Sequence, residues 1–258
     1  MFDFGIIADP FFYAVAIPAC LITGISKGGF GGAMGLLGVP LIALAVPPAQ
    51  AAAILLPILC AMDIVGLLTY RRLADWRNLA ILLPGAVIGI TLCYIVWDYL
   101  DDNSIRFILG AMALTFTLKT WLLPVPHSTI KGRSVAKGGI AGVICGFTSF
   151  IAHAGGPPVQ IYLLPQRLDK TLYVGTTVWL FSLINFIKLP PYYSLGLLSA
   201  ENLGTSLVLA PLAPLGVWLG VRIHAMVPEK LFYRFAWIML FVTGLKLTWD
   251  ALAGWGIL

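Results

Sequence analysis

The sequence predicts an all-α polytopic membrane protein made of two inverted repeats, each with a broken or short helix pair at a Gly-rich break followed by three transmembrane helices. Three observations support this fold class. Of the 258 residues, 60% are hydrophobic and 10% charged, against about 25% charged in soluble domains, which excludes a water-soluble globule. Long apolar runs alternate with short polar loops. Matching motifs also recur in the same order in both halves of the chain.

Apolar segments, bounded by Gly, Pro and charged residues, define the expected elements in order. They lie near residues 10–26, 33–46, 49–69, 79–97, 105–123, 136–152, 157–165, 171–188, 203–221 and 231–250. A helix needs about 20 residues to cross a bilayer. Segments 33–46 and 157–165 are shorter and adjoin Gly-rich stretches, so we expect half-helices or re-entrant pieces there. The other eight segments could each cross.

The polar stretch 124–137 divides the chain near its middle. We therefore expect a first membrane repeat over 1–124, a cytoplasmic linker over 125–135 and a second membrane repeat over 136–258, within one transmembrane domain. The halves align at an offset that drifts from 118 to 128 residues. The matches include Gly38-Val39-Pro40 with Gly156-Pro157-Pro158, Asn78-Leu79 with Asn202-Leu203, Pro84 with Pro211, and Arg106-Phe107 with Arg234-Phe235.

Loop charges predict the orientation. Basic residues gather in alternate loops, which we assign to the cytoplasm because Lys and Arg are enriched there. Acidic residues fall in the other loops, which places both termini outside. The first-half loop RRLADWRN corresponds to PPYYSLGLLSAEN, and DYLDDNS corresponds to RIHAMVPEK, so the charge character swaps between halves. Five elements in each half, an odd number, would invert the second half. Inverted repeats with broken helices are typical of secondary transporters, which bind substrate near the midplane.

The first Gly-rich break, residues 24–32, contains Ser26, Lys27, Gly28 and Gly29. Glycines let the backbone unwind and present N–H groups, a half-helix N-terminus carries partial positive charge, and Lys27 adds a full charge. The pattern indicates an anion site, because a charge within lipid is costly and usually functional. The alternative is that the glycines allow close helix packing and that Lys27 reaches the membrane interface.

The second break occupies the equivalent place in the other half and leads into a short helix with Pro near its start. Its candidate binding residues are Ser149, His153, Gly155 and Gly156. His153 could donate a hydrogen bond to an anion or carry a proton. A lone His in a helix is, however, often only a hydrogen-bonded core residue. Gln160, just inside the short helix, is a weaker candidate.

Two further polar positions within apolar segments align with each other, Asp63 and Asn185. Asp63 could pair with a lysine or titrate during transport, because buried acids often carry protons. A static hydrogen bond between helices is an equal alternative. Lys188 follows Asn185 by about one turn, so the two share a helix face. The alternative for Lys188 is a position at the outer interface, next to Pro190.

Other function classes have less support. Ser149 and His153 stand four residues apart, as in an intramembrane serine hydrolase, but no GxSxG elbow accompanies them. An anion channel is a closer alternative, because inverted repeats and half-helices also build pores. The sequence has no Walker motif, no metal-ligand spacing around its four cysteines and no nucleic-acid-binding patch. We therefore expect no metal, cofactor or nucleic-acid partner, and the sequence allows a homo-oligomer.

Three stretches make the sequence resemble the TauE/SafE family of membrane permeases, also called sulfite exporters, over almost the whole chain. They are GISKGGFGG at 24–32, HAGGPP at 153–158 and INFIKLPPY at 184–192. The resemblance implies a bacterial inner-membrane protein of about eight spans that moves small sulfur-containing anions such as sulfite or sulfonates. The site residues that it implies are Lys27, Gly28, Gly29, His153, Gly155, Gly156, Asn185 and Lys188. We thus expect a secondary transporter with an anion between the repeats, and with Asp63 or His153 as the coupling residue if protons drive the cycle.

Overall fold

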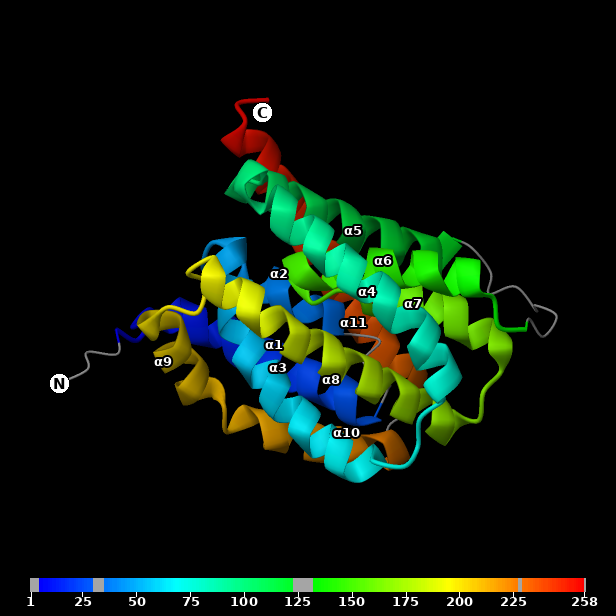
Figure 1. The fold of residues 1–258 in the computed structure, drawn as a ribbon. Coiled ribbons are helices and arrows are strands. Elements are labelled where there is room, and N and C mark those ends of the chain that lie inside the picture. The colour runs from blue at the N-terminus through cyan, green and yellow to red at the C-terminus, as the bar shows by residue number, and fades with distance from the viewer. Residues whose placement is uncertain (1–4, 30–34, 123–131, 227–228, 258) are drawn as a thin grey trace.

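A computed structural model describes residues 5–29, 35–122, 132–226 and 229–257. Every regular element in these ranges is helical, which confirms the all-α class (Figure 1). The first half contains α1 (Pro10–Gly29), η1 (Gly35–Leu37), α2 (Gly38–Ile42), α3 (Pro48–Tyr70), α4 (Trp76–Val96), η2 (Trp97–Tyr99) and α5 (Asp102–Leu122). The second half contains α6 (Val135–Ala152), α7 (Gly156–Leu163), η3 (Leu164–Gln166), α8 (Lys170–Ser194), α9 (Ala200–Leu209), α10 (Leu212–Met226) and α11 (Glu229–Gly254). Most of the predicted linker, residues 125–131, lies outside the described ranges.

Polar side chains fix where four helices begin. Asp75, Ser134, Asp169 and Ser199 precede α4, α6, α8 and α9, and each accepts hydrogen bonds from backbone N–H groups of the first turn. These N–H groups have no partner inside the helix, so such caps stabilise a helix by about 1 kcal/mol each.

Prolines act differently along the chain. The predicted segment 203–221 is divided into α9 and α10, which bend by 44° at a break that contains Pro211. Proline donates no N–H and its ring clashes with the preceding turn, which interrupts the helix there. The aligned Pro84 lies inside α4, which continues past it. Likewise, α8 continues through Pro190 and Pro191 to Ser194, beyond the predicted end at 188.

The helix lengths are those of a multi-pass membrane protein. Within the described residues, α1, α3, α4, α6 and α8 are long and apolar enough to cross a bilayer, and the bent α9–α10 pair passes as a sixth span. Helices α5 and α11, with 21 and 26 residues, are also long enough but more polar. The number of eight spans therefore stays a prediction. The short helices α2 and α7 have five and eight residues, too few to cross.

The most extensive helix contacts join the two halves. Helix α1 packs along α10, α4 along α6, α5 along α11 and α3 along α8. Each helix can be replaced by its counterpart in the other half: α1 by α6, α3 by α8, α4 by α9–α10 and α5 by α11. The same set of helix pairs then results. Two equivalent halves related by a two-fold axis would pack in this way. The pairing therefore favours a repeat, whose inversion and boundaries stay predictions.

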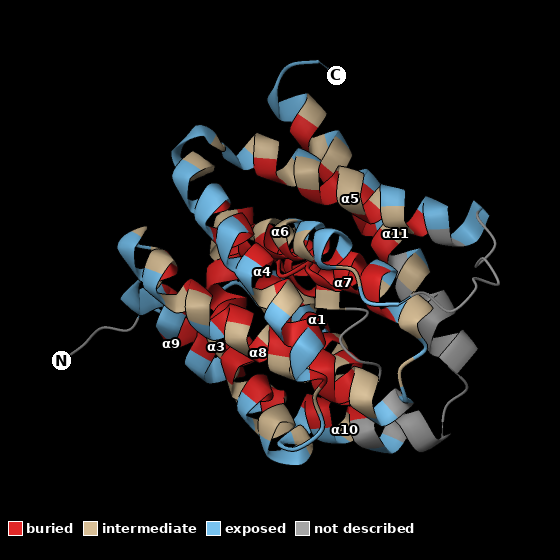
Figure 2. Ribbon diagram, turned by 45° about the vertical axis from the view of Figure 1, so that its right-hand side comes forward, coloured by how far each residue is buried: buried red, intermediate tan, exposed pale blue. Residues whose placement is uncertain are grey.

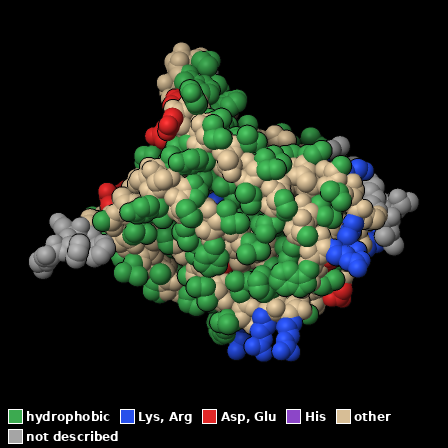
Figure 3. Space-filling view, in the orientation of Figure 1, with side chains coloured by type: hydrophobic (Ala, Val, Ile, Leu, Met, Phe, Trp, Pro, Cys, Tyr) green, Lys and Arg blue, Asp and Glu red, His purple; other side chains and the backbone are tan. Residues whose placement is uncertain are grey.

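The core lies at the centre of this bundle, where α1, α3, α6, α7 and α8 carry many of the buried residues (Figure 2). The outside carries large apolar side chains such as Leu68 and Leu207, both 72% exposed. Figure 3 shows a broad hydrophobic surface, with Lys and Arg side chains gathered at one end of the molecule. Such a surface fits contact with lipid acyl chains.

Candidate functional site

Two adjoining polar clusters lie between the two halves of the bundle. The carboxylate cluster consists of Lys27, Asp63 and Asn185. The ammonium cluster consists of Ser149, His153 and Lys188. Helix α8 carries Asn185 and Lys188 one turn apart and so joins the clusters. The structure thus brings together six of the residues that the sequence singles out.

In the carboxylate cluster, Asp63 on α3 is held from two sides. Lys27 Nζ on α1 lies 2.5 Å from Asp63 Oδ1, and Asn185 Nδ2 donates to Asp63 Oδ2 at 2.6 Å. The Asp63 side chain is 3% exposed and that of Lys27 is 15% exposed. A carboxylate removed from water is costly unless charged and hydrogen-bonding partners replace the water. Both oxygens of Asp63 have such a partner here.

In the ammonium cluster, Lys188 is wholly buried. Its Nζ donates to Ser149 O at 3.0 Å and Ser149 Oγ at 3.1 Å, and lies 2.6 Å from His153 Nδ1. Three acceptors match the three donors of an ammonium group. All three are neutral, and no carboxylate among the described residues forms an ion pair with Lys188. The cluster therefore holds a buried amine, with a positive formal charge, that has no ionic partner within the described part of the chain.

His153 connects this lysine to α3. Its Nε2 lies 2.9 Å from the carbonyl oxygen of Ala52. A carbonyl oxygen only accepts, so Nε2 carries the proton and Nδ1 of the neutral ring accepts from Lys188. The backbone of His153 is left-handed, with φ 53° and ψ 26°, at the C-cap of α6. Glycine usually occupies this position because a side chain is strained there. A histidine in its place indicates that the imidazole has a role at this point.

The two clusters together carry one net positive formal charge. Lys27 and Lys188 contribute two positive charges and Asp63 one negative charge, with His153 neutral by the hydrogen bonds just described. Charges interact strongly where protein and lipid exclude water. An anion with a single negative charge would bring the site to neutrality.

A small cavity adjoins the carboxylate cluster between α1, α3, α8 and α10. Its wall includes Lys27 and Asp63 and follows α3 to Thr69 and Tyr70 at the end of that helix. The next residues belong to the basic loop that the sequence assigns to the cytoplasm. Lys188 is not part of this wall. The cavity therefore lies beside the carboxylate cluster on the side of the basic end, and its wall does not include the ammonium cluster's Lys188.

The second break lies where the sequence predicts it. Helix α6 ends before His153, and α7 begins at Gly156. A Cβ on Gly155 would lie 2.6 Å from Cys145 Sγ and 3.1 Å from the Cys145 carbonyl oxygen. Only glycine fits so close to α6, so Gly155 lets the chain fold back beside the ammonium cluster.

The short helix α7 offers fewer donors than the pattern suggests. Pro157 and Pro158 follow directly after its first residue and have no N–H. Gln160 is half-buried on α7, and within the described residues its side chain makes no hydrogen bond to either cluster. Its place in the site stays a prediction.

The expectation that the backbone unwinds from residue 24 is wrong. Helix α1 continues through Gly29, so the N–H groups of Ser26, Gly28 and Gly29 lie within a regular helix. Residues 30–34, the remainder of the predicted break, lie outside the described part of the chain. Within 24–29, the side chain of Lys27 reaches the carboxylate cluster.

The glycines of α1 instead allow close packing. A Cβ on Gly28 would lie 2.3 Å from the carbonyl oxygen of Val217 on α10. Small residues at such contacts let the backbones of membrane helices approach each other. The packing alternative therefore fits Gly28, whereas the partly buried Lys27 side chain forms an ion pair with Asp63.

Some groups around the site could not be assigned from the sequence. The sequence does not indicate that the Ala52 carbonyl orients His153, because every residue has a backbone carbonyl. Tyr192 is buried, donates from its hydroxyl to the Phe150 carbonyl at 2.5 Å and stacks near His153. The sequence feature that could have identified Tyr192 is its position at the end of the stretch INFIKLPPY. Among the described residues, no group of three or more His, Cys, Asp or Glu side chains could hold a metal ion.

Comparisons with known proteins cover both clusters. The family described as Sulfite exporter TauE/SafE matches residues 16–247. A curated protein of Comamonas testosteroni, described as Probable inner membrane transporter protein TsaS, is 28% identical over 191 residues, which cover 71% of this chain and 76% of that protein. No solved structure gives a significant match.

Proposed function

Because this chain belongs to the TauE/SafE sulfite exporter family, we propose that it carries a small sulfur-containing anion, of the sulfite or organosulfonate class, across the bacterial inner membrane. Its family, its transporter relative and its apolar helices make it a multi-pass membrane transporter. We place its basic end in the cytoplasm and both termini outside, in keeping with the positive-inside rule. The proposed anion site is the pair of clusters between the two halves.

The buried charge of Lys188 carries this proposal. Its ammonium is removed from water and contacts only neutral acceptors. Burial of an unpaired charge is costly, and a charge kept in a membrane protein usually serves function. An anion that enters the site would supply the missing partner, and its binding would be favoured by the net charge of the two clusters.

The donors of the site suit an oxyanion. Lys27 and Lys188 offer ammonium groups and Asn185 offers an amide, from α1 and from two successive turns of α8. Several N–H donors can share a negative charge that is spread over the oxygen atoms of a sulfite or sulfonate group. A halide ion, whose charge lies on a single atom, would be bound less well by donors that come from separate places in the site.

The closed surroundings favour a carrier over a channel. Asn185 and Lys188 are 3% and 0% exposed, so no open path passes through the site. A carrier encloses its substrate between two halves and opens to one side at a time. We propose transport without a chemical step, because the family and the curated relative are both described as transporters or exporters.

Asp63 is the proposed coupling residue. An anion at Lys27 would compete with Asp63 for the same ammonium group. A buried carboxylate without its cation is costly, and protonation removes that cost. An anion and a proton would therefore bind together. His153 is the second candidate, but both of its ring nitrogens are already engaged, so a contact to Ala52 or Lys188 must open before it takes up a proton.

Ligand-induced thermal stabilisation of the purified protein tests the proposal. Sulfite, thiosulfate, sulfoacetate, taurine, sulfate and chloride would be compared on the wild type, on Lys27→Met and on the control Lys246→Met, whose side chain is 59% exposed. A ligand at a hundred times its Kd stabilises by about 2.7 kcal/mol. We expect a sulfur oxyanion to stabilise the wild type and the control but not Lys27→Met. If no sulfur anion stabilises the wild type, the proposed substrate class is wrong.

A further inference from the structure

Two amide pairs join the halves at opposite ends of α3. Gln50, in the first turn of α3, donates from Nε2 to Asn202 Oδ1 at 3.1 Å. Beyond the other end of α3, Asn78 Nδ2 donates to Gln166 Oε1 at 2.9 Å. Helix α3 has 23 residues and is roughly 34 Å long, so the two pairs lie toward its opposite ends. We name Gln50–Asn202 the α9 clamp and Asn78–Gln166 the α4 clamp.

The clamps occupy equivalent positions in the two halves. Asn78 and Asn202 open the aligned Asn-Leu pairs, and each is the third residue of its helix. Each donates its backbone N–H to the capping side chain three residues earlier, Asp75 or Ser199, at 3.2 Å. The glutamine partner comes in both cases from the segment that follows the short helix of the opposite half. The same contact between halves is thus built twice, once at each end.

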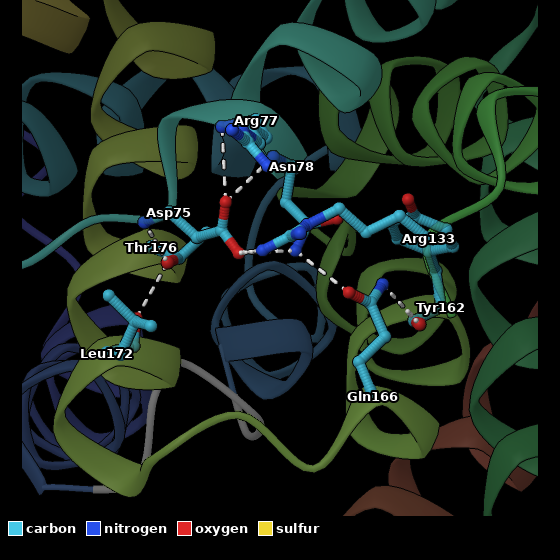
Figure 4. Close-up of polar contacts among 8 residues, drawn as sticks. All are labelled: Asp75, Arg77, Asn78, Arg133, Tyr162, Gln166, Leu172 and Thr176. Atoms are coloured by element: carbon cyan, nitrogen blue, oxygen red, sulfur yellow. Dashed lines mark hydrogen bonds and ion pairs between the residues drawn. The ribbon is translucent and has the colours of Figure 1, made fainter. Parts of the chain in front are cut away.

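The α4 clamp belongs to a larger network, drawn in Figure 4. Asp75 Oδ2 accepts from Asn78 Nδ2 at 3.0 Å and from Arg133 at 2.6 Å, and the Asp75 backbone N–H donates to Thr176 at 2.8 Å. Gln166 is held in turn by the Tyr162 carbonyl of α7. This end therefore ties together α4, α7, α8 and the segment before α6, partly through an ion pair.

The α9 clamp is simpler. Asn202 Nδ2 donates to the Leu197 carbonyl at 2.8 Å, and Ser206 on the next turn of α9 donates to the Ile54 carbonyl of α3 at 2.7 Å. Among the described residues, no ion pair joins this clamp. Both clamps are closed in this structure, while Lys188 between them is wholly buried.

We propose that the two clamps are the gates of the transport cycle. The inference rests on the proposed carrier function, because a carrier must break contacts between its halves at one end while those at the other end hold. Opening of the α4 clamp admits the anion from the basic end, and opening of the α9 clamp admits it from the opposite end.

Reversible cross-linking tests the gates. One variant carries Asn78→Cys with Gln166→Cys, the other carries Gln50→Cys with Asn202→Cys, and each is compared before and after oxidation to a disulfide. The four single variants are the matched controls. The native cysteines stay in place, since all are buried. Uptake of radiolabelled sulfoacetate into vesicles and stabilisation by sulfoacetate are measured on the same preparations, since sulfite itself would cleave the disulfide. Mass spectrometry verifies the cross-link.

We expect oxidation of either pair to lower transport by about tenfold or more and reduction to restore it, with no such change in the single variants. Sulfoacetate should still stabilise both oxidised proteins, because the opposite end stays free to open. Unchanged transport in either oxidised protein would overturn the gate assignment, as would loss of sulfoacetate stabilisation in both. If the wild type neither transports nor binds any sulfur anion, the proposed function fails instead.

Discussion

Replacement of Lys188 by Met removes the buried charge and keeps an unbranched apolar side chain of similar length. The variant should bind sulfite much more weakly, because a charge-assisted hydrogen bond contributes about 1.5–3 kcal/mol. Loss of one such bond to the anion corresponds to a roughly 10- to 150-fold higher Kd, at 1.4 kcal/mol for each factor of ten. Loss of the wider electrostatic attraction would add to this.

The fold should tolerate the change. The Ser149 carbonyl keeps a hydrogen bond from the His153 backbone N–H at 3.0 Å, so His153 Nδ1 is the main group that loses its donor. An unsatisfied buried acceptor costs about 1–3 kcal/mol, which removal of the buried charge offsets in part. Titration calorimetry gives the Kd, and the exposed Lys246→Met variant is the control for loss of a positive charge. A Kd for Lys188→Met within threefold of the wild type would refute the role of Lys188.

Three further predictions follow from the same geometry. Asp63→Asn should bind sulfite but lose the dependence of its transport on the proton gradient, and normal gradient dependence in vesicles would exclude Asp63 as the coupling residue. Gly28→Ala should destabilise the protein by roughly 1–3 kcal/mol, because the added Cβ would lie 2.3 Å from a carbonyl oxygen of α10, whereas Gly35→Ala meets no atom within 4 Å and is the control in thermal unfolding. Burial raises the pKa of Asp75, but hydrogen bonds from Arg133 and the first turn of α4 outweigh it and hold this pKa below its usual value, so the stabilisation is present at neutral pH and is lost only as the pH falls through the lowered pKa. Thermal unfolding between pH 3 and 7 should show an acid loss that Asp75→Asn reduces, and identical profiles would contradict this.

The sequence predicted which segments form the bundle because apolar runs mark the segments that can contact lipid and charged residues mark the loops between them. It placed Asn185 and Lys188 on one helix face, and the structure confirms their one-turn spacing. It could not show that Lys188 meets His153 from another helix, because that contact depends on how α8 crosses α6. A composition or spacing rule contains no information about a crossing angle.

The glycines of α1 show why local patterns are ambiguous. Gly28 fits both an unwound anion loop and a close helix crossing, since both need the absence of a side chain. Only the position of α10, with the Val217 carbonyl against α1, decides between them. Pro211 was a visible signal for the bend between α9 and α10, but Pro84 shows that an equivalent proline need not end a helix.

The two adjacent prolines of α8 make this helix easier to bend at one point. Pro190 and Pro191 supply no N–H, so the carbonyl oxygens of Phe186 and Ile187 lack the donors that a regular helix places four residues further on. Two adjacent backbone hydrogen bonds are therefore missing, which lowers the stiffness of the helix at this point, and helices kink at such points. Lys188 sits between the free carbonyls and the prolines. The last turns of α8 can therefore bend more easily than the rest of the helix, directly beside the residue that carries the buried amine.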